Sequence, residues 1–156
     1  MAEHQTFPDI AEVAIGPVIE ADLDWIVALD TQNTGMAKPD YWKRLFDGAR
    51  TEPGRTFFLV ARDGGRPLGF IAGEIRAWEF GSPPCGWIFA IGVEPDCRLK
   101  SVGTQLFDAV CDGFRQAGVT KVRTMIARDA VLILSFFRAH GMMAGPFVEL
   151  EKDLVE

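Results

Sequence analysis

The amino-acid sequence predicts a mixed α/β fold with its elements in the order β-α-α-β-β-β-α-β-α-β. Two helical patterns follow the first strand pattern, and three consecutive strand patterns then precede the third helix. The last of these three strands, Trp87–Val93, passes through a short basic segment directly into an amphipathic helix. A doubly wound nucleotide-binding fold would instead alternate strands and helices throughout, with a glycine-rich loop after its first strand.

The first elements follow a polar tail at residues 1–11. The run at 12–19 is expected to form the first strand. A helix is expected to begin at Glu20, because apolar residues then recur near helical spacing and acids in the first turn suit the helix dipole. After a loop, Pro39 is expected to open a second helix, for which Gly48 is a plausible stop.

A meander of three strands is expected next. The β-rich runs at 56–61 and 67–78 are separated by an Asp-Gly-Gly turn within residues 62–66, which is a signal for a hairpin. A second break at 79–86 holds two prolines and two glycines and leads into the strand at 87–93.

Helices and strands alternate in the remainder of the chain. The expected elements are a helix at 101–117, a strand at 121–127, a helix at 130–140 and a final strand at 147–154. Gly118 and Gly141 are each expected to end the helix before them. No linker or repeat interrupts the pattern, so residues 12–156 are expected to form a single domain.

Composition argues against several classes of protein. A net charge of −6 argues against nonspecific nucleic-acid binding, which needs basic patches. The longest apolar run, at 87–92, is too short to span a membrane, and the N-terminal residues lack signal-peptide features. Three widely spaced cysteines without a C-x-x-C pair indicate neither a disulfide framework nor a zinc site. We therefore expect a cytoplasmic protein that needs no metal and has no membrane or nucleic-acid partner.

The run from Ile91 to Leu106 carries the main functional signal, because a strand feeds a basic loop that opens a helix. The first N–H groups of a helix lack partners within it, and the helix dipole favours negative charge there. Arg98 and Lys100 add positive charge beside those amides. The pattern predicts a site for a phosphorylated ligand. Taken alone, the same residues also fit an ordinary strand-to-helix turn with solvated charges.

The spacing Val93-x-Pro95-x-x-Arg98-x-x-Ser101-x-Gly103-x-x-Leu106 resembles the pyrophosphate loop of the GNAT family of N-acetyltransferases, V-x-P-x-x-Q/R-x-x-G-x-G/A-x-x-L. The order of elements resembles that family from about residue 12 onward. The resemblance implies the acyl-CoA N-acyltransferase fold, acetyl-CoA as co-substrate and acyl transfer to an amine. Ser101 departs from the usual glycine, but serine keeps the backbone N–H and adds a hydroxyl that can reach a phosphate or cap the helix.

The resemblance also assigns residues to acetyl-CoA. Pantetheine would bond to backbone groups of the fourth strand, where this strand and the fifth splay apart, and the pyrophosphate would bond to the loop amides. The residues assigned in this way are Ile91, Gly92, Val93, Arg98, Leu99, Lys100, Ser101, Val102, Gly103, Thr104 and Phe137. Gly92 has an equal interpretation as a β-bulge or a tight packing contact.

The helix at 130–141 resembles the second motif of the family, N-x-x-A-x-x-L/F-Y-x-x-x-G-F. Anchored on Gly141, the asparagine position is Ala130 and the tyrosine position is Phe137. In the family this tyrosine often reprotonates the CoA thiolate, and a phenyl ring cannot do so. Phe137 can pack against pantetheine or serve as a core aromatic. Since a thiol has a reference pKa of about 8.5, water can suffice as the acid.

An acceptor amine must lose a proton before it attacks, and a carboxylate is the usual base. The candidates are Glu74 and Glu79, with Glu94 at the end of the fourth strand. Glu74 shares a strand face with Phe70 and Ala72, although a solvated charge is the commoner role for any one acid. Cys97 suggests an acetyl-cysteine intermediate, but direct attack in a ternary complex is the better mechanism, because no histidine lies near it in sequence.

Three functions fit the sequence. The first is an acetyl-CoA-dependent N-acetyltransferase acting on a primary amine, with a protein lysine preferred and a small-molecule amine or polyamine as alternative. The second is a non-catalytic acyl-CoA sensor, which Ala130 and Phe137 make credible. The third is an unrelated α/β domain that binds another phosphorylated ligand. A homodimer is compatible with each function. The loops expected to bind the acceptor, at 31–38 and 145–149, contain no motif that identifies it.

Overall fold

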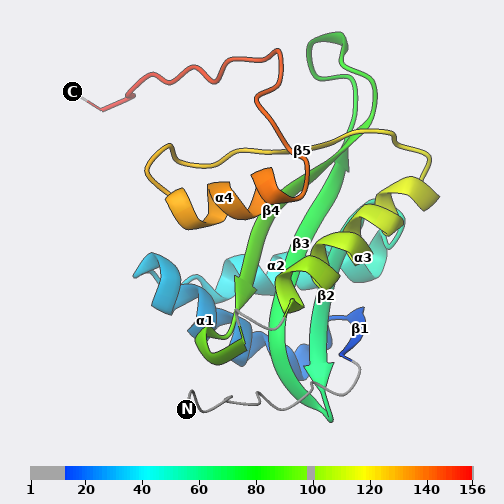
Figure 1. Cartoon of the computed structure of the whole chain (residues 1–156), viewed down its shortest axis with the longest axis vertical. Helices are drawn as coiled ribbons and strands as arrows, with labels where there is room; N and C mark the ends of the chain where they lie inside the picture. Colours follow the sequence, from blue (N-terminus) through cyan, green and yellow to red (C-terminus); the bar gives the residue numbers. More distant parts are fainter. Residues whose placement is uncertain (1–12, 98–100, 156) are drawn as a thin grey trace, which may run out of the picture. The chain divides into compact units, whose positions relative to one another are not determined.

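The computed structural model describes residues 13–97 and 101–155. Residues up to Met125 belong to one compact unit and those from Ile126 to a second. The first unit holds a sheet of five strands in the spatial order β1-β2-β3-β4-β5 (Figure 1). Its strands are β1 (Ala14–Pro17), β2 (Thr56–Asp63), β3 (Arg66–Arg76), β4 (Cys85–Val93) and β5 (Val122–Thr124). Its helices are α1 (Leu23–Thr34), α2 (Pro39–Thr51) and α3 (Val102–Gln116), with short 3₁₀ turns η1 (Glu20–Asp22), η2 (Glu79–Gly81) and η3 (Pro95–Cys97).

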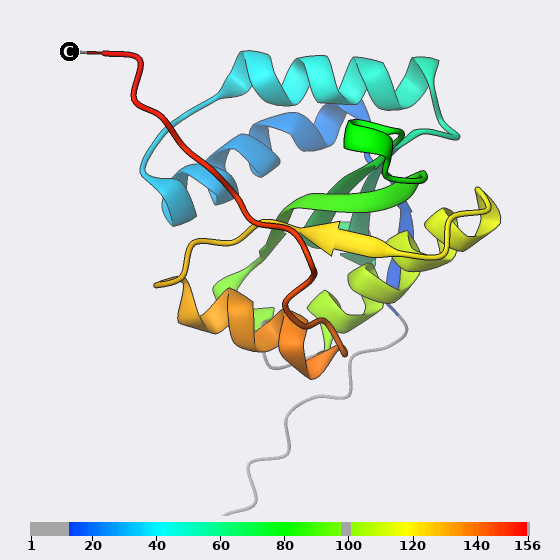
Figure 2. The ribbon, with the colours of Figure 1, turned by 90° about the horizontal axis from the view of Figure 1, so that it is seen from above.

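The sheet lies between two helical layers. Figure 2 shows α1 and α2 together on one face of the sheet and α3 on the other. Strands β1 to β4 pair antiparallel, and β5 pairs parallel with β4. The mixed α/β fold predicted from the sequence is therefore confirmed, with the three-strand meander in its expected place.

The turn between β2 and β3 follows from its two glycines. Asp63 pairs with Arg66, so only Gly64 and Gly65 connect the strands. Both have positive φ, at 53° and 90°, which is the conformation of a type I′ hairpin turn. Residues with a Cβ rarely adopt such angles, and the Gly-Gly pair therefore sets the register of the hairpin.

The face of the sheet beneath α1 and α2 is packed with aromatic rings. Trp42 of α2 stacks on Phe58 of β2, with ring centroids 5.8 Å apart, and meets Phe70 of β3 edge-on at 5.3 Å. These three side chains are buried, as are Ile26 and Leu29 of α1. The alternation of side chains along each strand places this cluster on one face only.

The opposite face packs against α3 through small residues. A Cβ added to Gly73 would lie 2.8 Å from Cζ of Phe114, and one added to Gly113 would lie 2.7 Å from Cε1 of Phe57. Phe57 and Phe114 meet edge-on at 5.2 Å. Helix α3 can therefore approach the sheet closely, because Gly73 of β3 stands opposite the Phe114 ring of α3 and Gly113 of α3 stands opposite the Phe57 ring of β2.

The second unit contains α4 (Val131–Ala139). Gly141 follows it with φ 85°, and the N–H of Met142 donates to the carbonyl of Phe137. This is the glycine stop that the sequence predicts, and Gly118 ends α3 in the same way with φ 86°.

The final strand expected at 147–154 is wrong. Residues 142–155 contain no strand, and the apolar side chains of this segment, among them Phe147, Val148 and Leu150, are exposed. The fifth strand is also shorter than expected, three residues in place of seven. Apolar alternation marks a segment that can join a sheet, but a strand forms only where a neighbouring edge accepts its hydrogen bonds. Whether residues 12–156 act as one domain stays a prediction of the sequence.

Candidate active site

The central feature of the site is the point where β4 and β5 separate. Their parallel pairing covers three positions, from Gly86 with Val122 to Ile88 with Thr124. The Thr124 hydroxyl donates to the Ile88 carbonyl at 2.8 Å and closes the paired stretch. Beyond it β4 continues to Val93, whereas β5 has ended. The family resemblance implies this divergence, and the β4 residues after Ile88 have no paired partner on β5.

A β-bulge accompanies the divergence. Ala72 pairs with Ala90 and Gly73 pairs with Ile88, so Phe89 is an extra residue on β4. A bulge bends its strand and increases the local twist. The extra residue, Phe89, directly follows the last residue of β4 that pairs with β5, Ile88.

Gly92 has a packing role. A Cβ at this position would lie 2.7 Å from Cε1 of Phe70 and 3.3 Å from Cδ2 of Leu29. Of the two structural interpretations of Gly92, tight packing is the one observed, because the bulge falls three residues earlier. Ile91 and Val93 flank it on the same strand and pair with Ile71 and Gly69 of β3.

The start of α3 has no side-chain cap. Ser101 precedes the helix with φ 58°, and its side chain makes no capping bond to the helix. The first helical bond runs from the N–H of Gln105 to the Ser101 carbonyl at 3.0 Å, so the amides of Val102 and Gly103 come before it. The left-handed conformation also explains why the family pattern has glycine at this position.

The loop before α3 is held at its first residues. Cys97 is buried at 2% exposure, its N–H donates to the Glu94 carbonyl at 2.9 Å, and Arg66 donates to Asp96 at 2.9 Å. This arginine and the nearby Cys97 thiol lower the pKa of Asp96. Burial of Cys97 agrees with its interpretation as a small apolar filler. Arg98, Leu99 and Lys100 lie outside the described residues.

Glu74 lies on the α1–α2 face of the sheet, as its alternation with Phe70 and Ala72 predicted. It pairs in register with Trp87 of β4, two residues before the bulge at Phe89. Its Oε1 accepts a hydrogen bond from Nε of Arg76 at 2.8 Å. Glu74 therefore combines a fixed carboxylate with a position beside the separating strands.

Tyr41, in the first turn of α2, belongs to the same surroundings. Burial raises the pKa of its phenol, the negative charges of Glu74 and then Asp30 raise it further, and Arg76 opposes them. Asp30 accepts from the Trp42 indole at 3.3 Å and lies 3.0 Å from Nζ of Lys38. We call the six side chains of this surface the Tyr41 cluster: Asp30, Lys38, Tyr41, Glu74, Arg76 and Trp87.

The other two candidate bases lie elsewhere. Glu79 is exposed in η2, in the loop between β3 and β4. Glu94 accepts from the Trp25 indole at 2.6 Å and so ties the end of β4 to α1. The structure thus places Glu74 alone of the three within the Tyr41 cluster.

Phe137 is 3% exposed in α4, where its ring meets Phe136 at 5.2 Å. His140 packs on Phe136 with ring centroids 4.4 Å apart. The burial of Phe137 agrees with its interpretation as a core aromatic. The pantetheine contact predicted for Phe137 stays a prediction.

Sequence reasoning did not find the partners of Glu74 in the Tyr41 cluster. Arg76 lies on the same strand two residues on, so alternation could have signalled that both side chains share a face. Tyr41 and Asp30 come from two helices, and no sequence spacing shows that they approach β3. Trp87 could have been found only from the register between β3 and β4.

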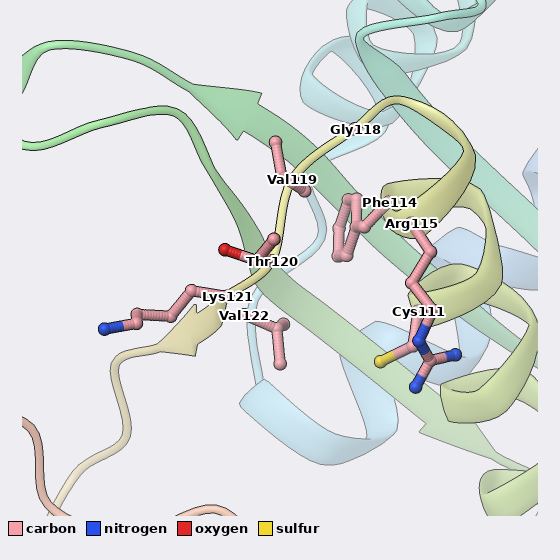
Figure 3. Close-up of a pocket in the computed structure, with 8 residues that line it drawn as sticks. All are labelled: Cys111, Phe114, Arg115, Gly118, Val119, Thr120, Lys121 and Val122. Atoms are coloured by element: carbon pink, nitrogen blue, oxygen red, sulfur yellow. The ribbon is translucent and has the colours of Figure 1, made fainter.

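A separate pocket of ≈ 450 Å³ lies at the other end of α3. Figure 3 shows Cys111, Phe114 and Arg115 of the helix facing the segment from Gly118 to Val122, with the Lys121 amino group directed away from Cys111. Burial raises the pKa of the Cys111 thiol, which makes it a poor nucleophile. None of the residues predicted to bind acetyl-CoA lines this pocket.

An open mixed sheet whose parallel strands separate beside an uncapped helix start has the architecture of an acyl-CoA N-acyltransferase. A family model described as the acetyltransferase (GNAT) family matches residues 23–142, and the chain belongs to this family. Membership of this family makes it an acetyl-CoA-dependent N-acetyltransferase. The backbone of β4 and the first amides of α3 are chemically suited to the amide and phosphate groups of that co-substrate.

Solved structures share the fold at low identity. The aminoglycoside acetyltransferase AAC(6')-Iy, solved with the bisubstrate analogue CoA-S-monomethyl-acetylneamine, is 17% identical with a TM-score of 0.78 and matches over 93% of this chain and all of its own. AAC(6')-Ih from Acinetobacter baumannii is 19% identical, with a TM-score of 0.75 over 93% and 100% of the two chains. A protein described as a transcriptional regulator from Bacillus halodurans C-125 is 17% identical, with a TM-score of 0.75 over 92% and 100%. A search of curated protein sequences found no match.

Two further findings concern the described residues only. No group of three or more histidine, cysteine, aspartate or glutamate side chains in residues 13–97 and 101–155 is arranged to hold a metal ion. Within the same ranges, none of the helices combines the length and the apolar character needed to cross a membrane.

Proposed function

We propose that this enzyme transfers the acetyl group of acetyl-CoA to a primary amine of a small molecule, with Glu74 as the general base. The observation that carries the proposal is the position of Glu74. It lies on the α1–α2 face of the sheet, paired with Trp87 two residues before the bulge at which β4 leaves β5. An amine held at the Tyr41 cluster would thus stand next to the thioester end of pantetheine.

On the donor side, the proposed contacts follow the chain. The backbone of Ile91, Gly92 and Val93 bonds to pantetheine, and the pyrophosphate meets the amides from Leu99 to Thr104, with Arg98 and Lys100 alongside. Acetyl-CoA supplies an activated thioester carbonyl. The role of the chain is to hold that carbonyl beside the amine, which removes much of the entropic cost of the reaction.

On the acceptor side, Glu74 takes a proton from the ammonium group, directly or through one water. The amine nitrogen then forms a bond to the thioester carbonyl carbon, the C–S bond breaks, and the electron pair leaves with sulfur. The nitrogen loses its second proton to water, which gives the neutral amide. Solvent protonates the thiolate, because Phe137 carries no acidic proton and a thiolate is a good leaving group.

Small-molecule acceptors are favoured over a protein lysine, which was the first expectation from the sequence. Three different structural neighbours named aminoglycoside acetyltransferases, AAC(6')-Iy, AAC(6')-Ih and meta-AAC0020, match this chain over 92% or more of its length. The Tyr41 cluster is also compact and partly buried, which suits a small acceptor. A cytoplasmic location and a homodimer stay predictions of the sequence.

The test is release of free CoA thiol with acetyl-CoA and an amine panel, for the wild type and three variants. Glu74→Gln is expected to lower kcat by about 10²-fold or more, the usual contribution of a positioned base. Glu79→Gln and Glu94→Gln serve as matched controls and are expected to keep kcat within about threefold, an effect under about 0.7 kcal/mol. Equal loss in all three variants would contradict the assignment of the base.

The alternative of an acyl-CoA sensor predicts a different result. It predicts acetyl-CoA binding without thiol release for every amine, and Ala130 and Phe137 at the motif positions favour it. Faster acetylation of lysine side chains in an unfolded protein than of any small amine would instead favour a protein lysine as the acceptor.

A further inference from the structure

The charged groups of the Tyr41 cluster are already paired with one another. Lys38 Nζ lies 3.0 Å from Asp30 Oδ2, and Arg76 Nε donates to Glu74 Oε1 at 2.8 Å. About one third of the side-chain surface of Lys38, Glu74 and Arg76 is exposed, whereas that of Asp30 is 12% exposed. The four charges therefore balance within a small and partly buried region.

This balance is unfavourable for a polycationic acceptor. A polyamine or an aminoglycoside gains most from carboxylates that have no cation beside them. Here each carboxylate has one, so the additional ammonium groups of a polycation find no unpaired carboxylate in the Tyr41 cluster and lie close to Lys38 or Arg76. Like charges at such distances repel, and the repulsion is stronger in a partly buried site than in water.

The pairing of Arg76 with Glu74 uses only one of the three guanidinium nitrogens. Arg76 uses Nε for Glu74, and among the described residues no hydrogen bond is recorded for its two terminal nitrogens. Its guanidinium carbon lies 4.6 Å from the centre of the Trp87 ring, within the range of a cation–π contact. A guanidinium held in this way can bind a carboxylate through two parallel N–H···O bonds.

The Glu74 carboxylate can bind an ammonium group, and the Arg76 guanidinium can bind a carboxylate, so the pair suits an amine that also carries a negative charge. We infer that the acceptor is a primary amine of the amino-acid type, with its ammonium group at Glu74 and its carboxylate at Arg76. The Trp87 ring gives apolar surface beside the Arg76 guanidinium. This inference rests on the proposed function, because it assumes that the amine reacts at Glu74.

The experiment compares acceptors that differ by one charge. CoA thiol release is measured for the full chain with phenylalanine, leucine and glutamine, with the amide of each, and with spermidine and kanamycin A. We expect kcat/KM to be roughly tenfold or more higher for the acids than for their amides, which is the usual worth of a charge-assisted hydrogen bond. Spermidine and kanamycin A are both expected to have a lower kcat/KM than the best acid.

Variants of Arg76 test whether this residue binds the carboxylate of the acceptor. Arg76→Gln is expected to lower the acid-to-amide ratio of kcat/KM by roughly tenfold, and the ratio cancels any effect on Glu74 that both acceptors share. Arg55→Gln is the matched control, because Arg55 forms an exposed pair with Glu52 at 3.5 Å, and it should leave the ratio unchanged. If Arg76→Gln does not fold, Arg76→Lys, which keeps the charge but loses the planar fork, should lower the ratio severalfold.

The failures of the two proposals can be distinguished. A higher kcat/KM for kanamycin A, spermidine or the amides than for every acid would overturn the inference and leave the proposed function standing. An acid-to-amide ratio that Arg76→Gln leaves unchanged would also overturn it. No thiol release with any amine would overturn the proposed function, and the inference with it.

Discussion

At the scale of single residues, Tyr41 reports on the proposed acceptor site. It is the single tyrosine of the chain, and its phenol is affected by both carboxylates of the cluster and by Arg76. Burial is the largest cause of its raised pKa, followed by Glu74 and Asp30. A titration of tyrosine absorbance therefore observes this one position.

We expect the folded protein to form tyrosinate only above the ordinary pKa of 10.0, and the urea-unfolded protein to form it near 10.0. Because the folded pKa is raised, the stability linked to the neutral phenol is complete below pH 10 and is lost as pH rises through the folded pKa. Glu74→Gln should move the folded midpoint downward, because it removes a negative charge. Absorbance near 295 nm measures the titration midpoint of the wild type and of the variant. A midpoint that Glu74→Gln leaves unchanged would contradict the placement of Glu74 near Tyr41.

At the scale of elements, glycines decide how closely α3 approaches the sheet. A Cβ at Gly86 would overlap the Phe114 ring, and one at Gly73 would lie 2.8 Å from its Cζ. Both strand positions thus accommodate the same ring. The packing of α3 also sets the position of its N-terminus at the proposed pyrophosphate site.

Gly86→Ala should destabilise the protein by about 1–3 kcal/mol, because Phe114 must leave its rotamer or α3 must shift. Gly54→Ala is the control, since a Cβ there meets no atom within 4 Å, and it should change stability by less than about 0.5 kcal/mol. Urea unfolding gives both values from the midpoint at constant m. Equal stability of the two variants would show that α3 is not packed as described.

At the scale of the whole molecule, the co-substrate is expected to stabilise the fold. A ligand at 100 times its Kd adds about 2.7 kcal/mol to the stability of a native state that alone binds it. Acetyl-CoA should therefore raise Tm, and ATP or NAD at the same concentration should not. A thermal shift that ATP or NAD also produces would favour a general phosphate site.

Gly103→Asp should abolish the acetyl-CoA shift, since it places a carboxylate at the start of α3, where the pyrophosphate is proposed to bind. Gly54→Asp adds the same charge at an open surface turn and should keep the shift. Both variants are compared by thermal shift and by Kd. Full acetyl-CoA affinity in a folded Gly103→Asp protein would contradict the loop assignment.

The sequence by itself determined the architecture and the family. Local signals are responsible, because each depends on residues that are neighbours in the chain. They include the Gly64-Gly65 hairpin, the glycine stops at 118 and 141, and the motif from Val93 to Leu106. The final strand at 147–154 failed for the opposite reason, since pairing depends on an edge that lies elsewhere.

Only the tertiary structure decided how the candidate residues are arranged. It showed that Phe89 is the bulge residue, that Gly92 is a packing contact, and that Glu94 is bonded to Trp25. It also brought Asp30 and Tyr41 from two helices to Glu74 on β3. Strand register and helix packing depend on many contacts between residues that are far apart in the chain, and local sequence patterns do not show which of these residues meet.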